Sequence, residues 1–193
     1  MKQALDRIES ESIRMTSLVE DLLLLARLDE GHTLEMESVD LAQIVRDALS
    51  DAYVTSPEHQ WGAEGIEEPV AITGDGSAIH QVVVNLLANA RVHTPPGTSV
   101  EVRVKQTEDK TVLQVEDTGP GIPRDARKKL FERFARGDSS RARSSGSTGL
   151  GLSIVDTIVK AHGGEVTLTS MPGRTVFTAT LPTPKVAKTV VIP

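Results

Sequence analysis

The feature that most constrains the fold of this chain is a β-branched run that ends in a carboxylate and a glycine turn. Residues 111–116 read Thr-Val-Leu-Gln-Val-Glu, which predicts a strand, and residues 117–122 continue with Asp-Thr-Gly-Pro-Gly-Ile. Since glycine has no Cβ, the main chain at Gly119 and Gly121 can lie against a flat ligand or adopt a positive φ. A carboxylate at the strand end would accept hydrogen bonds, and an exocyclic amine such as N6 of adenine would suit it. A Pro-Gly turn capped by Asp117 is the simpler interpretation of this stretch alone.

The composition excludes several classes of protein. A length of 193 residues allows one domain with a good core plus an appendage, and 38% hydrophobic with 25% charged residues is typical of a globular chain. The net charge of −6 argues against a nucleic-acid partner, because no face can be strongly basic without a stronger acidic one elsewhere. The absence of cysteine excludes disulfides, thiolate metal sites and a cysteine nucleophile. The lack of cysteine suits a reducing cytoplasm, and a cytoplasmic domain is expected. The longest apolar run, residues 22–26, is far short of the ~20 residues of a membrane span, and no signal peptide is visible.

Residues 1–30 predict one long helix, because they contain neither Gly nor Pro and Gly31 supplies a stop. Apolar residues recur at helical spacing between Leu5 and Ala26, and a run of leucines widens the apolar face. A lone helix cannot bury such a face, so we expect a partner, either a missing helix or a second copy of the chain. The alternative is a helix packed on its own domain.

The rest of the chain alternates helices with strands. Helices are expected at residues 41–56, 76–93 and 149–162, the second of them capped by Asp75. Strands are expected at residues 34–40, from Trp61, and at 70–73, 99–106, 111–116, 165–170 and 175–181. A short helix and a loop are expected within residues 122–148. Because helix crossovers alternate with hairpins, the order predicts a two-layer α/β (α+β) sandwich, in which three helices cover one face of a mixed, mostly antiparallel sheet and one long helix precedes it.

Two asparagines on the predicted helix 76–93 form a candidate cation site. Asn85 and Asn89 are four residues apart, so their amides lie on one face, opposite the apolar side that includes Leu86 and Leu87. Amide oxygens suit Mg²⁺, which prefers oxygen ligands and keeps some water. The alternative is a pair of solvated asparagines, although asparagine is a poor helix former and two on one face ask for a reason.

A third stretch combines glycines with the start of a helix. Residues 146–152 read Gly-Ser-Thr-Gly-Leu-Gly-Leu and run directly into the predicted helix 149–162. Such a turn presents free N–H groups and the positive end of the helix dipole, which favour phosphate oxygens. A Gly-x-Gly is weak evidence by itself, and neither a Walker P-loop nor the protein-kinase signature set occurs in the chain.

Taken in this order, the stretches resemble the ATP-binding catalytic domain of sensor histidine kinases, with the Bergerat (GHKL) fold. Residues 85–90 resemble its N box, 117–122 its first glycine box, 130–134 (Leu-Phe-Glu-Arg-Phe) its F box and 146–152 its second glycine box. The resemblance covers about residues 36–182 and implies an ATP-binding domain over 34–182, an ATP lid at about 123–148 and a loose tail at 183–193. Residues 1–30 resemble the second helix of the dimerisation and phosphoacceptor hairpin, whose first helix is missing.

The resemblance implies a role for individual residues. Asn89 would bind Mg²⁺ between the phosphates, with Asn85 beside it, and Arg136 would reach the phosphates. Asp117 would hold the adenine amine, and Ile122 would lie against the base. The other nucleotide-binding positions that the resemblance implies are His93, Gly119, Gly121, Thr148, Gly149, Leu150, Gly151 and Thr178.

The function implied by the resemblance is transfer of the γ-phosphoryl group of Mg-ATP to a histidine. That histidine would lie on a dimerisation helix of the same protein, and the group would pass on to the receiver domain of a response regulator. The parent protein is expected to be a homodimer in the inner or plasma membrane.

The sequence departs from the family pattern in two places. Val92 stands where the family usually has lysine or arginine, so one phosphate contact is missing unless Arg91 reaches round. No histidine has the sequence context of the family's phosphoacceptor; the five are His32, His59, His80, His93 and His162. We therefore expect this chain to bind ATP without phosphorylating itself.

Two alternative functions stay open at this point. One is an ATP-hydrolysing relative such as gyrase, MutL or the heat-shock chaperones. It is disfavoured because Asn85 stands where those enzymes usually carry a glutamate, and an amide cannot take a proton from water. The other is a non-catalytic nucleotide-binding or dimerising module.

Overall fold

The computed structural model describes residues 12, 15–16, 18–26, 34–134 and 149–183. Its main layer is a five-stranded sheet with the strand order β2-β4-β5-β7-β6. The strands are β2 (Gln60–Glu64), β4 (Ser99–Gln106), β5 (Lys110–Asp117), β7 (Arg174–Pro182) and β6 (Glu165–Met171). The pair β2–β4 is parallel and the other pairs are antiparallel, so the predicted mixed, mostly antiparallel sheet is confirmed.

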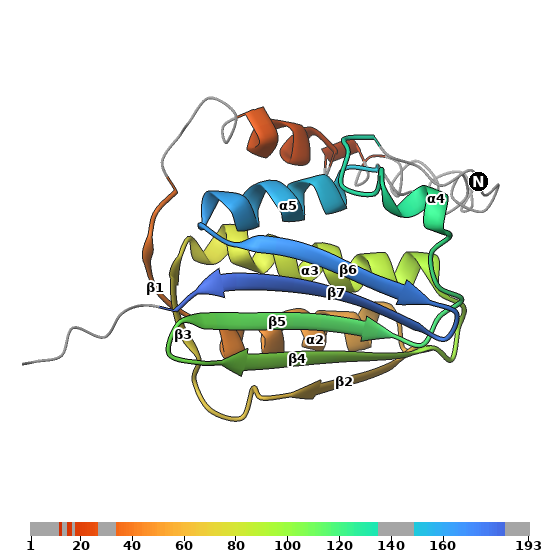
Figure 1. Ribbon diagram of the computed structural model, residues 1–193, viewed down its shortest axis with the longest axis horizontal. Coiled ribbons are helices and arrows are strands. Elements are labelled where there is room, and N and C mark those ends of the chain that lie inside the picture. Colours follow the sequence, from red (N-terminus) through yellow and green to blue (C-terminus); the bar gives the residue numbers. More distant parts are fainter. Residues whose placement is uncertain (1–11, 13–14, 17, 27–33, 135–148, 184–193) are drawn as a thin grey trace, which may run out of the picture.

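Three helices cover one face of this sheet, as predicted (Figure 1). They are α2 (Leu41–Thr55), α3 (Gly76–His93) and α5 (Gly151–Ala161). The carboxylate of Asp75 caps α3 by accepting hydrogen bonds from the N–H groups of Ser77 and Ala78, both at 3.0 Å, which satisfies two of the orphan donors of the first turn. A single turn, α4 (Arg124–Arg127), follows β5.

Two short strands stand apart from the main sheet. β1 (Glu37–Asp40) pairs only with β3 (Ala71–Gly74), antiparallel, as a separate two-stranded sheet. Both strands were expected from the sequence, but their pairing was not, because local patterning carries no information on which strands meet.

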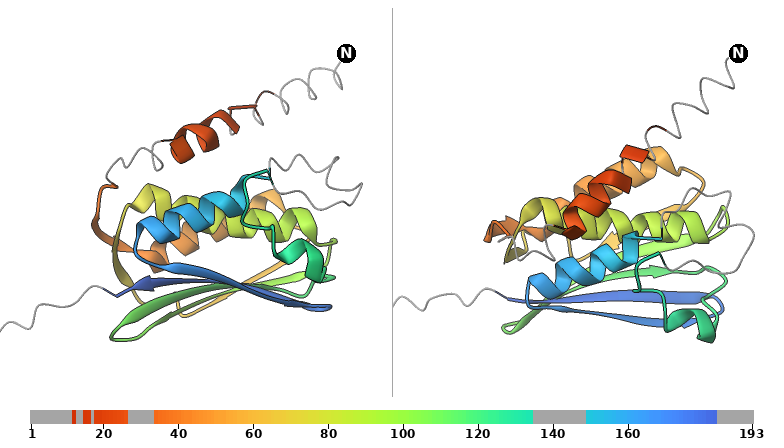
Figure 2. Two further views of the ribbon diagram at one scale, coloured as in Figure 1. Left: turned by 45° about the horizontal axis from the view of Figure 1, so that its top comes forward. Right: turned by 90° about the horizontal axis from the view of Figure 1, so that it is seen from above.

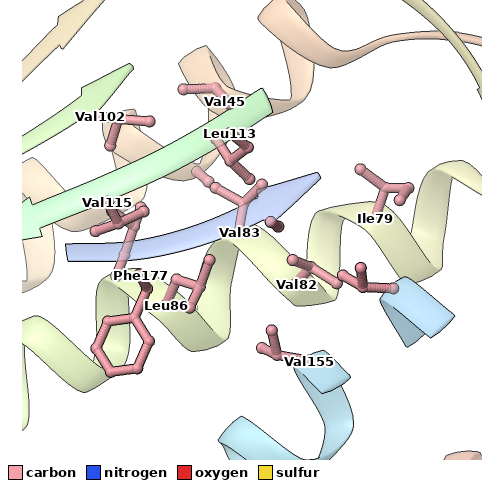
Figure 3. Close-up of a cluster of buried hydrophobic side chains, with 14 of the residues drawn as sticks. Val45, Ile79, Val82, Val83, Leu86, Val102, Leu113, Val115, Val155 and Phe177 are labelled. Carbon is pink, nitrogen blue, oxygen red and sulfur yellow. The ribbon is translucent and has the colours of Figure 1, made fainter. Parts of the chain in front are cut away.

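The core lies between the sheet and the helical layer (Figure 3). Side chains alternate along β5, so Leu113, Val115 and Asp117 face the helices, whereas Gln114 and Glu116 lie on the other face. Since Leu113 and Val115 are each 2% exposed, the inward face of the strand is anchored by packing. The same alternation fixes the direction of Asp117 at the strand end.

The N-terminal helix lies on the outer side of the helical layer (Figure 2). Residues 18–26 are helical, in agreement with the predicted helix 1–30 as far as that segment is described. Leu25 is 2% exposed and belongs to the core cluster, so the alternative interpretation, packing on its own domain, is correct for one face. The other face stays exposed and carries Met15, Val19, Leu22 and Leu23. None of the helices within the described ranges combines the length and apolarity that crossing a bilayer requires.

Candidate functional site

Asp117 is a buried acceptor at the end of β5. The residue is 5% exposed, and its Oδ1 accepts a hydrogen bond of 2.9 Å from the N–H of Gly119. Burial raises the pKa of Asp117; the N–H of Gly119 opposes this shift, and the charge of Glu116 adds to it. The second carboxylate oxygen accepts no hydrogen bond from the described residues, so it is available to a donor from outside the chain.

The turn after Asp117 leaves no room for side chains at its two glycines. A Cβ built on Gly119 would lie 2.6 Å from Cγ2 of Thr94 and 2.7 Å from Oδ1 of Asp117. Gly121 has φ +79°, and its Cβ would lie 2.6 Å from the carbonyl oxygen of Met171. Glycine is therefore required at Gly119 by space, and at Gly121 by both space and conformation.

The β6–β7 hairpin holds this turn in place. The N–H of Gly173 donates to the carbonyl oxygen of Gly119 at 2.9 Å, and the N–H of Ile122 donates to Oγ of Ser170 at 2.9 Å. Ser170 is itself buried and lies 3.0 Å from Oγ1 of Thr175. Ile122 is half-buried against the core cluster, so the end of the glycine turn is fixed on both sides.

The second half of α3 carries the two asparagines toward the start of α5. A Cβ built on Gly151 would lie 3.5 Å from Cγ of Asn85, in ordinary contact, so these two segments touch. Oδ1 of Asn85 accepts a 3.3 Å hydrogen bond from Gln81, but its Nδ2 is buried without a hydrogen-bond partner in the described part of the chain. The half-buried amide of Asn89 makes no hydrogen bond with the described residues either. Both amides thus retain unused polar atoms.

The start of α5 lies beside Asn85. Gly149 has φ +71°, Leu150 is fully buried and anchors the helix start, and α5 begins at Gly151. The first intrahelical acceptor in this turn is the Leu150 carbonyl, which is bonded by the N–H of Ile154 at 2.9 Å. Because the earlier N–H groups of a helix have no intrahelical acceptor, they favour an anion at this point.

The remaining candidates fall into three groups. His93 lies in the last turn of α3, and although the residue keeps contact with solvent, desolvation of its ring lowers the pKa of the imidazole. Thr178 is not brought to the site, because it pairs with Gln114 on the face of the sheet away from the helices and accepts a 3.2 Å hydrogen bond from it. Arg136 and Thr148 lie outside the described residues.

Arg91 does not compensate for Val92 in this structure. It lines a cavity of about 250 Å³ between α2 and α3, together with Val84 and Ala88. These three residues share the α2 side of α3, whereas Asn85 contacts Gly151 at the start of α5. The suggestion that Arg91 reaches round to the asparagine side is therefore not supported.

Sequence reasoning missed the residues that support the turn. Thr94 and Ser170 contact the glycine turn from segments 25 and 48 residues away from Gly119 and Ile122, respectively. The Pro172-Gly173 turn was expected as a hairpin turn, but no local signal indicates which other segment it would support.

Fold and site together define a class of protein: a two-layer α/β domain in which the start of one helix and a glycine turn after a buried carboxylate contact the second half of α3 and its C-cap residue, respectively, and α3 also carries the two asparagines. Comparison with known families agrees. Residues 74–185 match the family described as "Histidine kinase-, DNA gyrase B-, and HSP90-like ATPase", whose domain binds ATP. The chain belongs to this family, and within it to the sensor histidine kinases.

Two relatives come from Mycobacterium tuberculosis. The probable sensor histidine kinase TcrY is 56% identical over 179 residues, which is 93% of this chain and 38% of the relative. The sensor histidine kinase TrcS is 48% identical over 184 residues, covering 93% of this chain and 36% of the relative. The chain thus spans less than two-fifths of the length of these relatives.

Solved structures give the same assignment. The mycobacterial sensor histidine kinase MprB is 34% identical, with a TM-score of 0.67 over 76% of this chain and 97% of that one. Full-length ShkA in complex with AMPPNP is 29% identical, with a TM-score of 0.70 over 89% of this chain and 36% of that one.

Proposed function

We propose that this chain is the ATP-binding catalytic part of a sensor histidine kinase, and that it positions Mg-ATP for transfer of the γ-phosphoryl group to a histidine on a dimerisation helix. The acceptor would pass the group to the receiver domain of a response regulator. Asp117 carries the proposal, because it is a buried carboxylate with one oxygen held by the N–H of Gly119 and the other available.

The adenine end is assigned to the turn after β5. An exocyclic amine donates hydrogen bonds, and the free oxygen of Asp117 accepts them. The absence of side chains at Gly119 and Gly121 lets a flat base approach the backbone, with Ile122 supplying an apolar contact. Complex formation of ShkA with AMPPNP supports a nucleotide as the ligand of such a domain.

The phosphate end is assigned to α3 and α5. The N–H groups at the start of α5 favour phosphate oxygens, the amide of Asn85 lies beside this helix start, and Asn89 follows one turn further along α3. Within the described ranges, no cluster of three or more His, Asp or Glu side chains could hold a metal without the nucleotide. This fits Mg²⁺, which proteins often bind through one or two side chains plus substrate phosphates and which neutralises phosphate charge when bound.

Transfer is favoured over hydrolysis by the chemistry at Asn85. In transfer, the acceptor imidazole nitrogen forms a bond to the γ-phosphorus while the bond from phosphorus to the bridging oxygen breaks, and ADP leaves with that electron pair. The nucleophile brings its own lone pair, so this domain needs to supply only positioning and charge neutralisation. Activation of water would need a base, and an amide cannot serve as one.

Nucleotide titration by calorimetry tests the assignment of the two ends. The parent should bind ATP more tightly with Mg²⁺ than without it, and Asn89→Ala should lose that difference. Asp117→Asn should lower the affinity for ATP by about 10-fold or more, because the asparagine NH₂ and the adenine amine are both donors and cannot bond to each other. Equal ATP affinity in the parent and in Asp117→Asn would contradict the proposal.

Thermal melts provide the control for Asp117→Asn. Because burial raises the pKa of Asp117, the ionised carboxylate destabilises the folded state, and this penalty is absent at low pH and sets in as pH rises through the raised pKa. Asparagine can still accept from Gly119 and carries no charge, so the variant should be at least as stable as the parent at pH 7.

Labelled ATP tests the transfer step. Alone, the chain should acquire no label, whereas a longer chain that includes the dimerisation helix with its histidine should acquire acid-labile, base-stable label. Acid-labile label on this chain itself would overturn the expectation that it does not phosphorylate itself.

A further inference from the structure

His59 is a buried histidine to which the proposed function gives no role. It lies in the turn between α2 and β2 and is 6% exposed. The ring of His59 packs against the ring of Trp61, with the centroids 5.6 Å apart, and the backbone N–H of His59 donates to the carbonyl oxygen of Ser56 at 3.2 Å. The turn is further held by the N–H of Gly97, which donates to the Glu58 carbonyl at 2.7 Å. The imidazole is therefore fixed in position.

The hydrogen bonds around Thr94 determine which nitrogen of His59 carries the proton. Nε2 of His59 lies 3.0 Å from Oγ1 of Thr94, and the Thr94 hydroxyl donates to the carbonyl oxygen of Ala90 at 2.8 Å. Since a hydroxyl has one proton, which goes to Ala90, the Thr94 oxygen is the acceptor and Nε2 of His59 the donor. Nδ1 is left buried without a hydrogen-bond partner in the described residues, and Oε1 of Glu58 lies 3.5 Å from it.

Thr94 connects this histidine to the glycine turn. With its hydroxyl held by Ala90 and His59, the side chain of Thr94 has one orientation, and its methyl carbon Cγ2 faces Gly119. Gly119 in turn donates its N–H to Asp117 at 2.9 Å. A continuous set of contacts therefore runs from His59 through Thr94 and Gly119 to the carboxylate that is assigned to adenine.

We propose that His59 is a positioning residue of the nucleotide site, and that by orienting Thr94 it fixes the turn that presents Asp117 to the base. This inference rests on the proposed function of Asp117. Since His59 acts at the adenine end, its loss should change the ratio of ATP to GTP affinity. It should have a smaller effect on the part of the binding energy that comes from Mg²⁺ and the phosphates.

The test compares ATP and GTP affinities of His59 variants in the whole chain, in the presence of Mg²⁺. His59→Leu removes the donor and should lower the affinity for ATP by about fivefold, which is the effect of one neutral hydrogen bond, while the affinity for GTP changes less. His59→Gln restores an N–H donor and should recover the ATP preference. A purely structural role would lower the melting temperature of His59→Leu and leave the ratio of ATP to GTP affinity unchanged, and that result would overturn the inference.

Thr94 supplies an independent arm if His59→Leu is too unstable for titration. Thr94→Val keeps the branched shape and the contact with Gly119 but removes the acceptor, so it should reduce the ATP preference like His59→Leu, and His59→Gln should have no effect in that background. Unchanged preference in Thr94→Val would count against the inference. Asp117→Asn distinguishes the two proposals: if it leaves ATP binding intact, the proposed function fails, whatever the His59 variants do.

Discussion

Replacement of Gly119 by alanine is the most direct steric perturbation of the candidate site. The new methyl group would lie 2.6 Å from Cγ2 of Thr94 and 2.7 Å from Oδ1 of Asp117, both far inside ordinary contact. Thr94 cannot rotate away without giving up its hydrogen bonds to Ala90 and His59. The turn and the carboxylate of Asp117 must therefore move.

The expected losses follow from what this movement breaks. Overpacking of a filled site costs about 1–3 kcal/mol in the free energy of unfolding. Displacement of Asp117 removes a hydrogen bond between a charged acceptor and the adenine amine, which is worth about 1.5–3 kcal/mol, or about 10- to 150-fold in ATP affinity. The binding loss should appear in the variant even at temperatures where it is fully folded.

Urea unfolding and ATP titration of Gly119→Ala measure the two losses separately. Gly76→Ala is the matched control, because Gly76 has an ordinary φ, opens α3, and would place its Cβ 3.4 Å from Cγ1 of Val39. The control should change stability and ATP affinity little. ATP affinity of Gly119→Ala within about twofold of the parent would refute the steric argument and, with it, the placement of the base against this turn.

Other perturbations test the framework around the site. Nε2 of His162 accepts the N–H of Asp75 at 3.0 Å, so His162→Phe should strand a donor at the α3 cap and lower the urea stability by about 1–3 kcal/mol. Hydrogen bonds from Arg174 and Arg103 lower the pKa of Glu116. The ionised Glu116 therefore stabilises the folded state at pH values above the ordinary glutamate pKa, and this stabilisation is lost as pH falls through the lowered pKa. Glu116→Gln should melt at a lower temperature than the parent at neutral pH, and this difference should shrink over that acidic range. Burial raises the pKa of Asp21, so its ionised form destabilises the folded state as pH rises, and Asp21→Asn should raise the melting temperature at pH 7 but not at acidic pH.

The sequence predicted the fold well wherever the determining signal is local. The bounds of α3 agree at both ends, because Asp75 provides a cap and Thr94-Pro95 terminates the helix. The strands agree to within a few residues, since β-branched runs between turn signals mark them. The separate β1–β3 sheet escaped prediction because strand pairing depends on contacts between distant segments.

The same division applies to individual residues of the site. Asp117 and the glycines stand out because a residue type with special backbone or hydrogen-bonding properties sits at a strand end. The assignment of Thr178 to the nucleotide site came from the resemblance and is wrong in this structure. Phe177 faces the helices, so strand alternation puts the adjacent Thr178 on the opposite face of β7.

The residues that support the site carry no local sequence signal. Because they hold the glycine turn, variants at these residues should change nucleotide binding although they lie outside the motifs. His59 contacts Thr94 from 35 residues away, and Ser170 contacts Ile122 from 48 residues away, each through one ordinary hydrogen bond. Any buried polar residue could make such a bond, so residue type does not identify it. If the glycine turn is a rigid platform, its ligand selectivity depends on these distant supports as much as on Asp117 itself. We therefore expect the ratio of ATP to GTP affinity to change in Thr94→Val, which alters a support of the turn, and to stay unchanged in Gly76→Ala, which does not.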